Sequence, residues 1–171
     1  MTATEKSILI ALGSNLSHPT WGEPPAILMA AIEMLAQAGV STRRCSSIWR
    51  SAAWPDPTDP PYANAVIAVA TLLPPVDLLA ALHRIEAAFG RARGKLNAPR
   101  TLDIDLIAYG SLVHDGADGP QLPHPRTQDR AFVLRPLAEV DPAWRHPISG
   151  TGIAALLAAL PPDQTCVLWG D

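Results

Sequence analysis

Cysteine is scarce in this sequence of 171 residues, which contains only Cys45 and Cys166. The two lie far apart and lack the spacing of ligands in a structural zinc site. A pair of this kind is typical of reduced thiols rather than of the disulfide framework of a small secreted domain. We therefore expect a cytoplasmic protein whose fold does not depend on disulfides.

Basic charge and long apolar runs are lacking as well. The formal net charge is −3, which argues against a nucleic-acid binder held by phosphate contacts but leaves a local basic patch open. The apolar run near the N-terminus, from Ile8 to Leu12, is too short for a signal peptide or a membrane span. We expect neither nucleic acid nor a membrane among the partners.

Apolar residues are plentiful, at 48% of the chain, and this excludes disorder as the dominant state. The length suits one domain with a substantial core, so we expect residues 1–171 to form a single domain. The 18 prolines fall mostly between apolar segments, where they separate structural elements.

The order of predicted elements is strand, helix, strand, strand, helix, strand. That order is typical of a ferredoxin-like βαββαβ sandwich, an α+β fold with both helices on one face of an antiparallel sheet. The other face would be partly open and covered by loops, with extra C-terminal helices beyond it. The strands are expected over residues 7–15, 41–54, 62–73 and 101–110, and the helices over 26–39, 76–90, 129–140 (broken at Pro136) and 152–160.

Two carboxylates interrupt the apolar stretch Pro-Arg-Thr-Leu-Asp-Ile-Asp-Leu. Residues i and i+2 of a strand share a face, so Asp103 and Asp105 point to one side, and Leu102, Ile104 and Leu106 point to the helices. Neighbouring carboxylates repel one another unless a cation lies between them, and oxygen ligands at this spacing suit Mg²⁺. The alternative is a solvated outer face, and the pair alone does not exclude it.

Arginines gather around this pair. Arg100 precedes it by three residues, and Arg91 and Arg93 lie in the charged loop before it. Arginine binds phosphate oxygens bidentately, and carboxylates for Mg²⁺ beside arginines are typical of phosphoryl transfer. Ordinary surface charge is the alternative for Arg91 and Arg93, and a structural role is the alternative for His124.

Several motifs together resemble one known family. These motifs are Ala-Leu-Gly-Ser-Asn-Leu, Tyr-Ala-Asn-Ala-Val, the Asp-Ile-Asp stretch, Leu-Pro-His-Pro-Arg and Arg-Ala-Phe-Val-Leu. Their order and spacing resemble the 6-hydroxymethyl-7,8-dihydropterin pyrophosphokinases of the folate pathway, from about residue 8 to 142. The resemblance implies a diphosphokinase that binds ATP and a reduced pterin, with two Mg²⁺ ions, and we expect a monomer. The pterin hydroxyl would attack the β-phosphorus of ATP, the pyrophosphoryl group would transfer intact, and AMP would leave.

The resemblance also implies roles for individual residues. Asp103 and Asp105 match the metal ligands, and Arg91, Arg100 and Asp105 match the residues expected to be catalytic. The residues that match ATP contacts are His83, Glu86, Arg91, Arg93, Arg100, Leu106, His124 and Arg130. The residues that match the pterin site are Ser51, Ala52, Trp54, Tyr62, Asn64 and Phe132.

The physical chemistry of the pterin set agrees with that role. A flat ring is well held between the aromatic faces of Tyr62 and Phe132, and the amide of Asn64 offers a donor and an acceptor to the ring edge. Core packing is the alternative for the two aromatic residues, and a backbone cap is the alternative for Asn64.

Three segments depart from the family pattern, one of them the loop between Tyr109 and His124, where the resemblance places no adenine contact. Ser51 to Trp54 lacks the proline that many members carry, and Asn97-Ala98 replaces Trp-Gly in the loop 91–99, which closes over substrates in this family. Three alternatives follow: a relative acting on another pterin alcohol, a non-catalytic nucleotide- or pterin-binding module, and a structural interaction domain. The complete set of carboxylates and arginines argues against the second.

Overall fold

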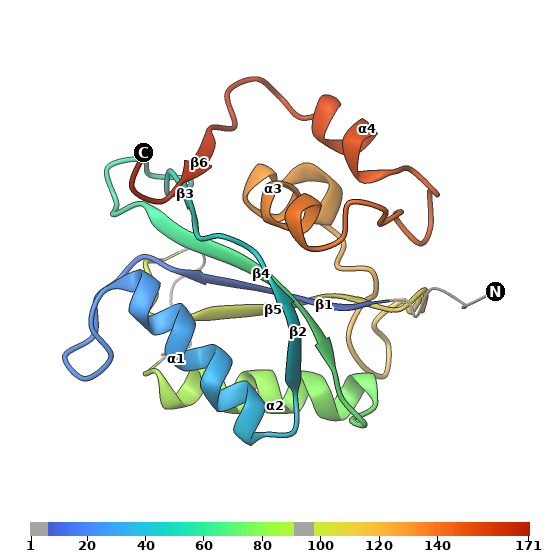
Figure 1. Ribbon diagram of the computed structural model, residues 1–171, viewed down its shortest axis with the longest axis horizontal. Coiled ribbons are helices and arrows are strands. Elements are labelled where there is room, and N and C mark those ends of the chain that lie inside the picture. The colour runs from blue at the N-terminus through green and yellow to red at the C-terminus, as the bar shows by residue number, and fades with distance from the viewer. Residues whose placement is uncertain (1–6, 91–97) are drawn as a thin grey trace.

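A six-stranded antiparallel sheet forms the centre of the computed structural model, which describes residues 7–90 and 98–171. The spatial order of the strands is β5-β1-β4-β3-β6, and β2 also pairs with β4 (Figure 1). The strands are β1 (Ile8–Ser14), β2 (Ser41–Cys45), β3 (Trp49–Ser51), β4 (Tyr62–Ala70), β5 (Asp103–Tyr109) and β6 (Cys166–Leu168). The antiparallel sheet predicted from the sequence is confirmed.

Helices pack on both faces of this sheet. Figure 1 shows α1 (Pro24–Gln37) and α2 (Pro75–Ala88) on one face and α3 (Ala131–Val140) and α4 (Ile153–Ala158) on the other. Because α1 and α2, the two helices of the predicted βαββαβ unit, share one face, the ferredoxin-like arrangement is confirmed. The expectation that loops cover the second face is wrong for much of it, because Val133, Leu134 and Leu137 of α3 form a second buried cluster with sheet residues such as Leu9 and Val66.

Strand β5 carries the predicted two-faced pattern. Leu102, Ile104 and Leu106 are buried in the core cluster shared with α1 and α2, and the intervening Asp103 and Asp105 stay partly exposed. The register between β1 and β5 then shifts after Leu106, so that the consecutive residues Ile107 and Ala108 both lie in the opposite cluster. The alternation predicted for the two carboxylates is therefore present where they lie.

Three details differ from the sequence expectation. Pro136 lies inside α3 without ending it, because the helix buries a continuous apolar face that offsets one lost hydrogen bond. The second predicted strand is two short strands, separated where the Ser46 hydroxyl accepts the Val66 N–H at 3.0 Å. Strand β6 lacks a strong sequence signal because it is only three residues long and forms by pairing with β3.

No helix within 7–90 and 98–171 is long and apolar enough to cross a membrane.

The two thiols should differ in reactivity. Cys45 is exposed, whereas Cys166 is 4% exposed and burial raises the pKa of its thiol to about 11. Burial and the charge of Glu139 also raise the pKa of Cys45, but its side chain is accessible. Since the thiolate is the reactive form and Cys166 is both buried and protonated, iodoacetamide at pH 8 should modify Cys166 at least about tenfold more slowly than Cys45. Mass spectrometry of a labelling time course measures both rates. A Cys45→Ser variant that is labelled quickly without denaturant would contradict this expectation.

Candidate active site

A cavity of about 520 Å³ opens where the ends of β1, β3, β4 and β5 face the start of α3. Residues predicted for both substrates line it. They are Ser51, Ala52, Trp54, Tyr62, Asn64, Arg100, Asp103, Asp105, Arg130 and Phe132. The fold thus brings the predicted pterin walls and the predicted metal ligands to one space, although they come from separate parts of the chain.

Positively charged groups surround the two carboxylates. Arg100 Nη1 lies 3.2 Å from Asp103 Oδ2, and Arg130 Nη1 lies 3.8 Å from Asp105 Oδ2. Burial lowers the pKa of Arg100, but Asp103, Tyr62 and Asp105 together outweigh that effect and raise it overall. Burial and neighbouring Arg126 lower the pKa of Arg130, whose guanidinium still stays charged at neutral pH. The cavity therefore combines hard oxygen ligands with two cations that suit phosphate oxygens.

His124 approaches the same carboxylate from a well-fixed loop. Its backbone N–H donates to Ile107 O at 2.8 Å, and its Nε2 lies 3.9 Å from Asp105 Oδ2. Burial lowers the pKa of His124, with Asp105 opposing and Arg130 reinforcing the shift, so the ring is neutral at pH 7. Because Nδ1 accepts the Arg126 N–H at 3.3 Å, the ring proton resides on Nε2 and points towards Asp105.

Asn64 is held firmly within the sheet. Its Nδ2 donates to Ser51 Oγ at 3.0 Å and to the carbonyl oxygens of Tyr62 and Trp49 at 3.2 and 3.3 Å. Its Oδ1 lies on the side of Gly13, where an added Cβ would come within 3.6 Å of that oxygen. A buried amide fixed in one orientation can offer a defined hydrogen-bonding edge to a flat ring.

Three aromatic side chains border the same end of the cavity. Tyr62 and Phe132 are half-buried, whereas the indole of Trp54 is 68% exposed. Burial raises the pKa of Tyr62, so its phenol stays protonated at neutral pH. The Arg130 guanidinium lies over the Phe132 ring, 5.4 Å from its centroid, and this stacking links the aromatic wall to the charged end of the cavity.

Some predicted residues lie elsewhere. His83 is exposed on α2, and Leu106 is buried in the core below the sheet. Glu86 is 3% exposed, and its Oε1 accepts the Ile104 N–H at 2.7 Å, which fixes β5 against α2. None of the three is among the residues lining the described cavity, and their ATP contacts stay predictions. Arg91 and Arg93, with most of the loop 91–99, lie outside the described residues.

Sequence reasoning missed the role of Asn15. Its side chain is 2% exposed, its Oδ1 accepts the Arg100 N–H at 2.9 Å, and its Nδ2 donates to Pro60 O at 3.0 Å. Asn15 thereby joins the backbone of the cavity residue Arg100 to the segment just before Tyr62. The only signal was its place in the Gly-Ser-Asn turn after the first strand, and a turn residue of that kind commonly caps its own backbone.

Comparisons with known proteins identify the family of this chain. The sequence model of the 7,8-dihydro-6-hydroxymethylpterin-pyrophosphokinase family matches residues 9–142. A 2-amino-4-hydroxy-6-hydroxymethyldihydropteridine pyrophosphokinase from Synechocystis sp. is 44% identical over 87% of this chain and 73% of its own length. The proteins of that name from Methylorubrum extorquens and Pseudomonas aeruginosa are 39% and 38% identical, over 90% of this chain and 93% and 91% of their own lengths. The chain therefore belongs to the 7,8-dihydro-6-hydroxymethylpterin-pyrophosphokinase family.

Proposed function

We propose that this protein transfers the pyrophosphoryl group of ATP to the hydroxymethyl group of 6-hydroxymethyl-7,8-dihydropterin in a Mg²⁺-dependent reaction of folate biosynthesis. The products are the pterin diphosphate and AMP. One observation carries the assignment of the site: a single cavity joins an aromatic wall with an oriented amide to two carboxylates flanked by arginines.

The residues at the charged end fit Mg²⁺. Asp103 and Asp105 extend from the same face of β5, and their side chains are 28% and 33% exposed, which leaves them accessible from the cavity. Magnesium in kinases is usually held by one or two carboxylates, with substrate phosphates and water completing its shell. Among the described residues no group of three or more His, Cys, Asp or Glu could hold a metal, so ATP would supply the further ligands. Bound there, Mg²⁺ would neutralise phosphate charge and polarise the reacting phosphorus.

The protein groups divide the remaining work. Tyr62 and Phe132 would hold the two faces of the pterin ring, and Asn64 would fix its edge. Arg100 and Arg130 would bind phosphate oxygens and stabilise charge that develops during transfer. Placing the pterin alcohol beside the β-phosphorus accounts for much of such a reaction, because phosphoryl transfer depends on positioning and electrostatics.

AMP formation from ATP tests this function directly. Purified protein with Mg²⁺ should form AMP when 6-hydroxymethyl-7,8-dihydropterin is present and none when it is absent. Absence of AMP from a folded protein that binds MgATP would contradict the proposed acceptor. Other pterin alcohols would then be assayed, because Trp54 at the cavity rim differs from the usual wall of the family.

Replacing Arg100 by alanine should slow the chemical step. Its guanidinium faces Asp103 at 3.2 Å, and loss of one preorganised electrostatic donor typically lowers kcat by about 10²–10³-fold. Arg44→Ala, on the exposed strand β2, removes the same charge away from the cavity and should leave kcat unchanged. Single-turnover kinetics with saturating ATP measures the step. A variant that loses only ATP affinity would show that Arg100 binds the ground state alone.

A further inference from the structure

The C-terminal segment contributes to the cavity, although residues 143–171 lie outside the part of the chain that matches the family model. Pro161, Asp163, Gln164 and Thr165 all line the cavity. Gln164 differs from the other three because both ends of its side-chain amide are engaged by backbone groups of the opposite wall.

Those two hydrogen bonds are made to the residues on either side of Arg130. Gln164 Oε1 accepts the Ala131 N–H at 2.9 Å, and Gln164 Nε2 donates to Asp129 O at 2.8 Å. Asp129 and Ala131 flank Arg130 in the sequence, and Ala131 begins α3. The first N–H groups of a helix lack partners within the helix, so the Gln164 oxygen satisfies one of them. One amide thus fixes the backbone on both sides of Arg130.

Fixing this backbone fixes the side chains that start from it. The Arg130 guanidinium lies 3.8 Å from Asp105 and 5.4 Å above the Phe132 ring centroid. Both contacts depend on where the Cα atoms of residues 130 and 132 lie. A shift of about 1 Å in such groups can lower the reaction rate about 100-fold. The two hydrogen bonds that fix the backbone on either side of Arg130 therefore matter for the rate of transfer.

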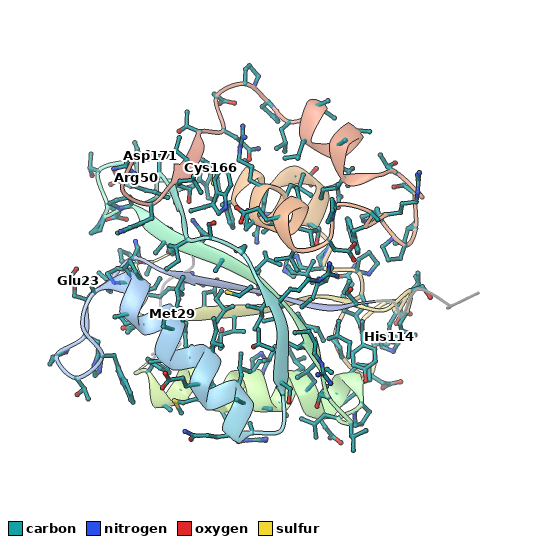
Figure 2. All side chains as sticks on the ribbon, in the orientation of Figure 1. Glu23, Met29, Arg50, His114, Cys166 and Asp171 are labelled. Atoms are coloured by element: carbon teal, nitrogen blue, oxygen red, sulfur yellow. The ribbon has the colours of Figure 1, made fainter. Side chains whose placement is uncertain are left out.

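The other end of the segment is anchored to the opposite side of the cavity. Two residues after Gln164, Cys166 begins β6 and pairs with Ser51 of β3. Trp169 N–H donates to Ile48 O at 2.9 Å, and Arg50 Nη2 donates to Asp171 O at 2.7 Å. Figure 2 shows Arg50, Cys166 and Asp171 together at this end of the sheet. Gln164 is therefore presented from the short segment directly before a strand that is itself part of the sheet.

We propose that Gln164 is a positioning residue, which holds Arg130 and Phe132 in the geometry that the transfer reaction needs. The inference rests on the proposed function. Gln164 lies outside residues 9–142, which match the family model. It would affect the reaction by fixing the backbone beside Arg130, without contacting the substrate itself. A purely structural cap of α3 is the competing role.

Two substitutions separate positioning from capping. Gln164→Met has a similar size and removes both hydrogen bonds. Gln164→Glu keeps an oxygen for the Ala131 N–H, and a carboxylate is favourable at a helix N-terminus, but it cannot donate to Asp129 O. Gln37→Met, at the exposed end of α1, is the matched control. Each protein is assayed for AMP formation, for MgATP affinity by calorimetry and for melting temperature.

We expect both Gln164 variants to lose kcat/KM by about tenfold or more at a temperature where they are folded, while Gln164→Glu keeps nearly the wild-type melting temperature. Gln37→Met should match the wild type throughout. Wild-type kinetics in Gln164→Glu, with a loss in Gln164→Met that follows its melting temperature, would overturn the proposal in favour of capping. If Gln164→Met does not fold, Gln164→Glu alone decides. If the wild type forms no AMP, the proposed function is wrong. The MgATP affinity of the Gln164 variants then still tests whether Gln164 holds Arg130 in place, because weaker binding than in the wild type is expected.

Discussion

Asp105→Asn should lower kcat by about 10³-fold or more while leaving the fold intact. The amide keeps the size of the side chain but loses the negative charge that a Mg²⁺ ligand provides. It also removes the charge that faces Arg130 at 3.8 Å and His124 at 3.9 Å, so both groups lose their common partner. Single-turnover measurement of AMP formation, with ATP and pterin saturating, reports the chemical step.

Stability should change little in the same variant. The Asp105 side chain is 33% exposed, and ion pairs of this exposure are typically worth at most about 1 kcal/mol. Urea unfolding should therefore place Asp105→Asn within about 1 kcal/mol of the wild type. Asp118→Asn, in the exposed loop after β5, makes the same chemical change away from the cavity and should affect neither measurement. Near-normal turnover by Asp105→Asn would refute its role as a metal ligand.

The sequence predicted those features of the fold and of the candidate site that depend on residue periodicity or on the order of elements and motifs along the chain. The period of two in the stretch around Asp103 and Asp105 predicts which face of the strand each residue occupies, and the structure confirms the split between acid and core. The order of elements predicts the ferredoxin-like sheet, because short connections and helix-covered strands leave few topologies. The family resemblance, which depended on several motifs in order, is confirmed by the match over residues 9–142.

Long-range hydrogen bonds were beyond such rules. Asn15 fixes the backbone of Arg100, and Gln164 fixes the backbone on both sides of Arg130. The sequence separations of these bonds are 85 residues for Asn15 and Arg100, and 33 and 35 residues for Gln164. Nothing in the local sequence of a turn asparagine or a loop glutamine indicates a partner at that distance. The same holds for β6, whose three residues become a strand only because β3 offers an unpaired edge. The residues expected to contact substrate lie in recognisable motifs, whereas the residues proposed to position them depend on the complete fold.

Removal of Mg²⁺ should abolish transfer of the pyrophosphoryl group. It should also weaken the binding of ATP, because the carboxylates of the cavity repel the triphosphate when no metal ion lies between them. With excess EDTA the wild type should form no AMP, and added Mg²⁺ should restore activity. Without the metal, the carboxylates of Asp103 and Asp105 would place two negative charges beside the triphosphate, which the facing Arg100 and Arg130 offset only in part. Each such charge disfavours phosphate binding by about 1 kcal/mol or more at the distances of a partly exposed site.

A variant lacking both charges should therefore reverse the effect of the metal on ATP binding. In EDTA, Asp103→Asn/Asp105→Asn should bind ATP about tenfold more tightly than the wild type, because the repulsion is gone. With Mg²⁺ the order should invert, since the variant gains nothing from a cation that it cannot hold. Calorimetric titration of both proteins under both conditions gives the four dissociation constants. If the two carboxylates were merely solvated charges on an open face, the variant would bind ATP at least as tightly as the wild type with Mg²⁺ as well. Only ligation of the metal predicts that the ranking of the two proteins changes with it.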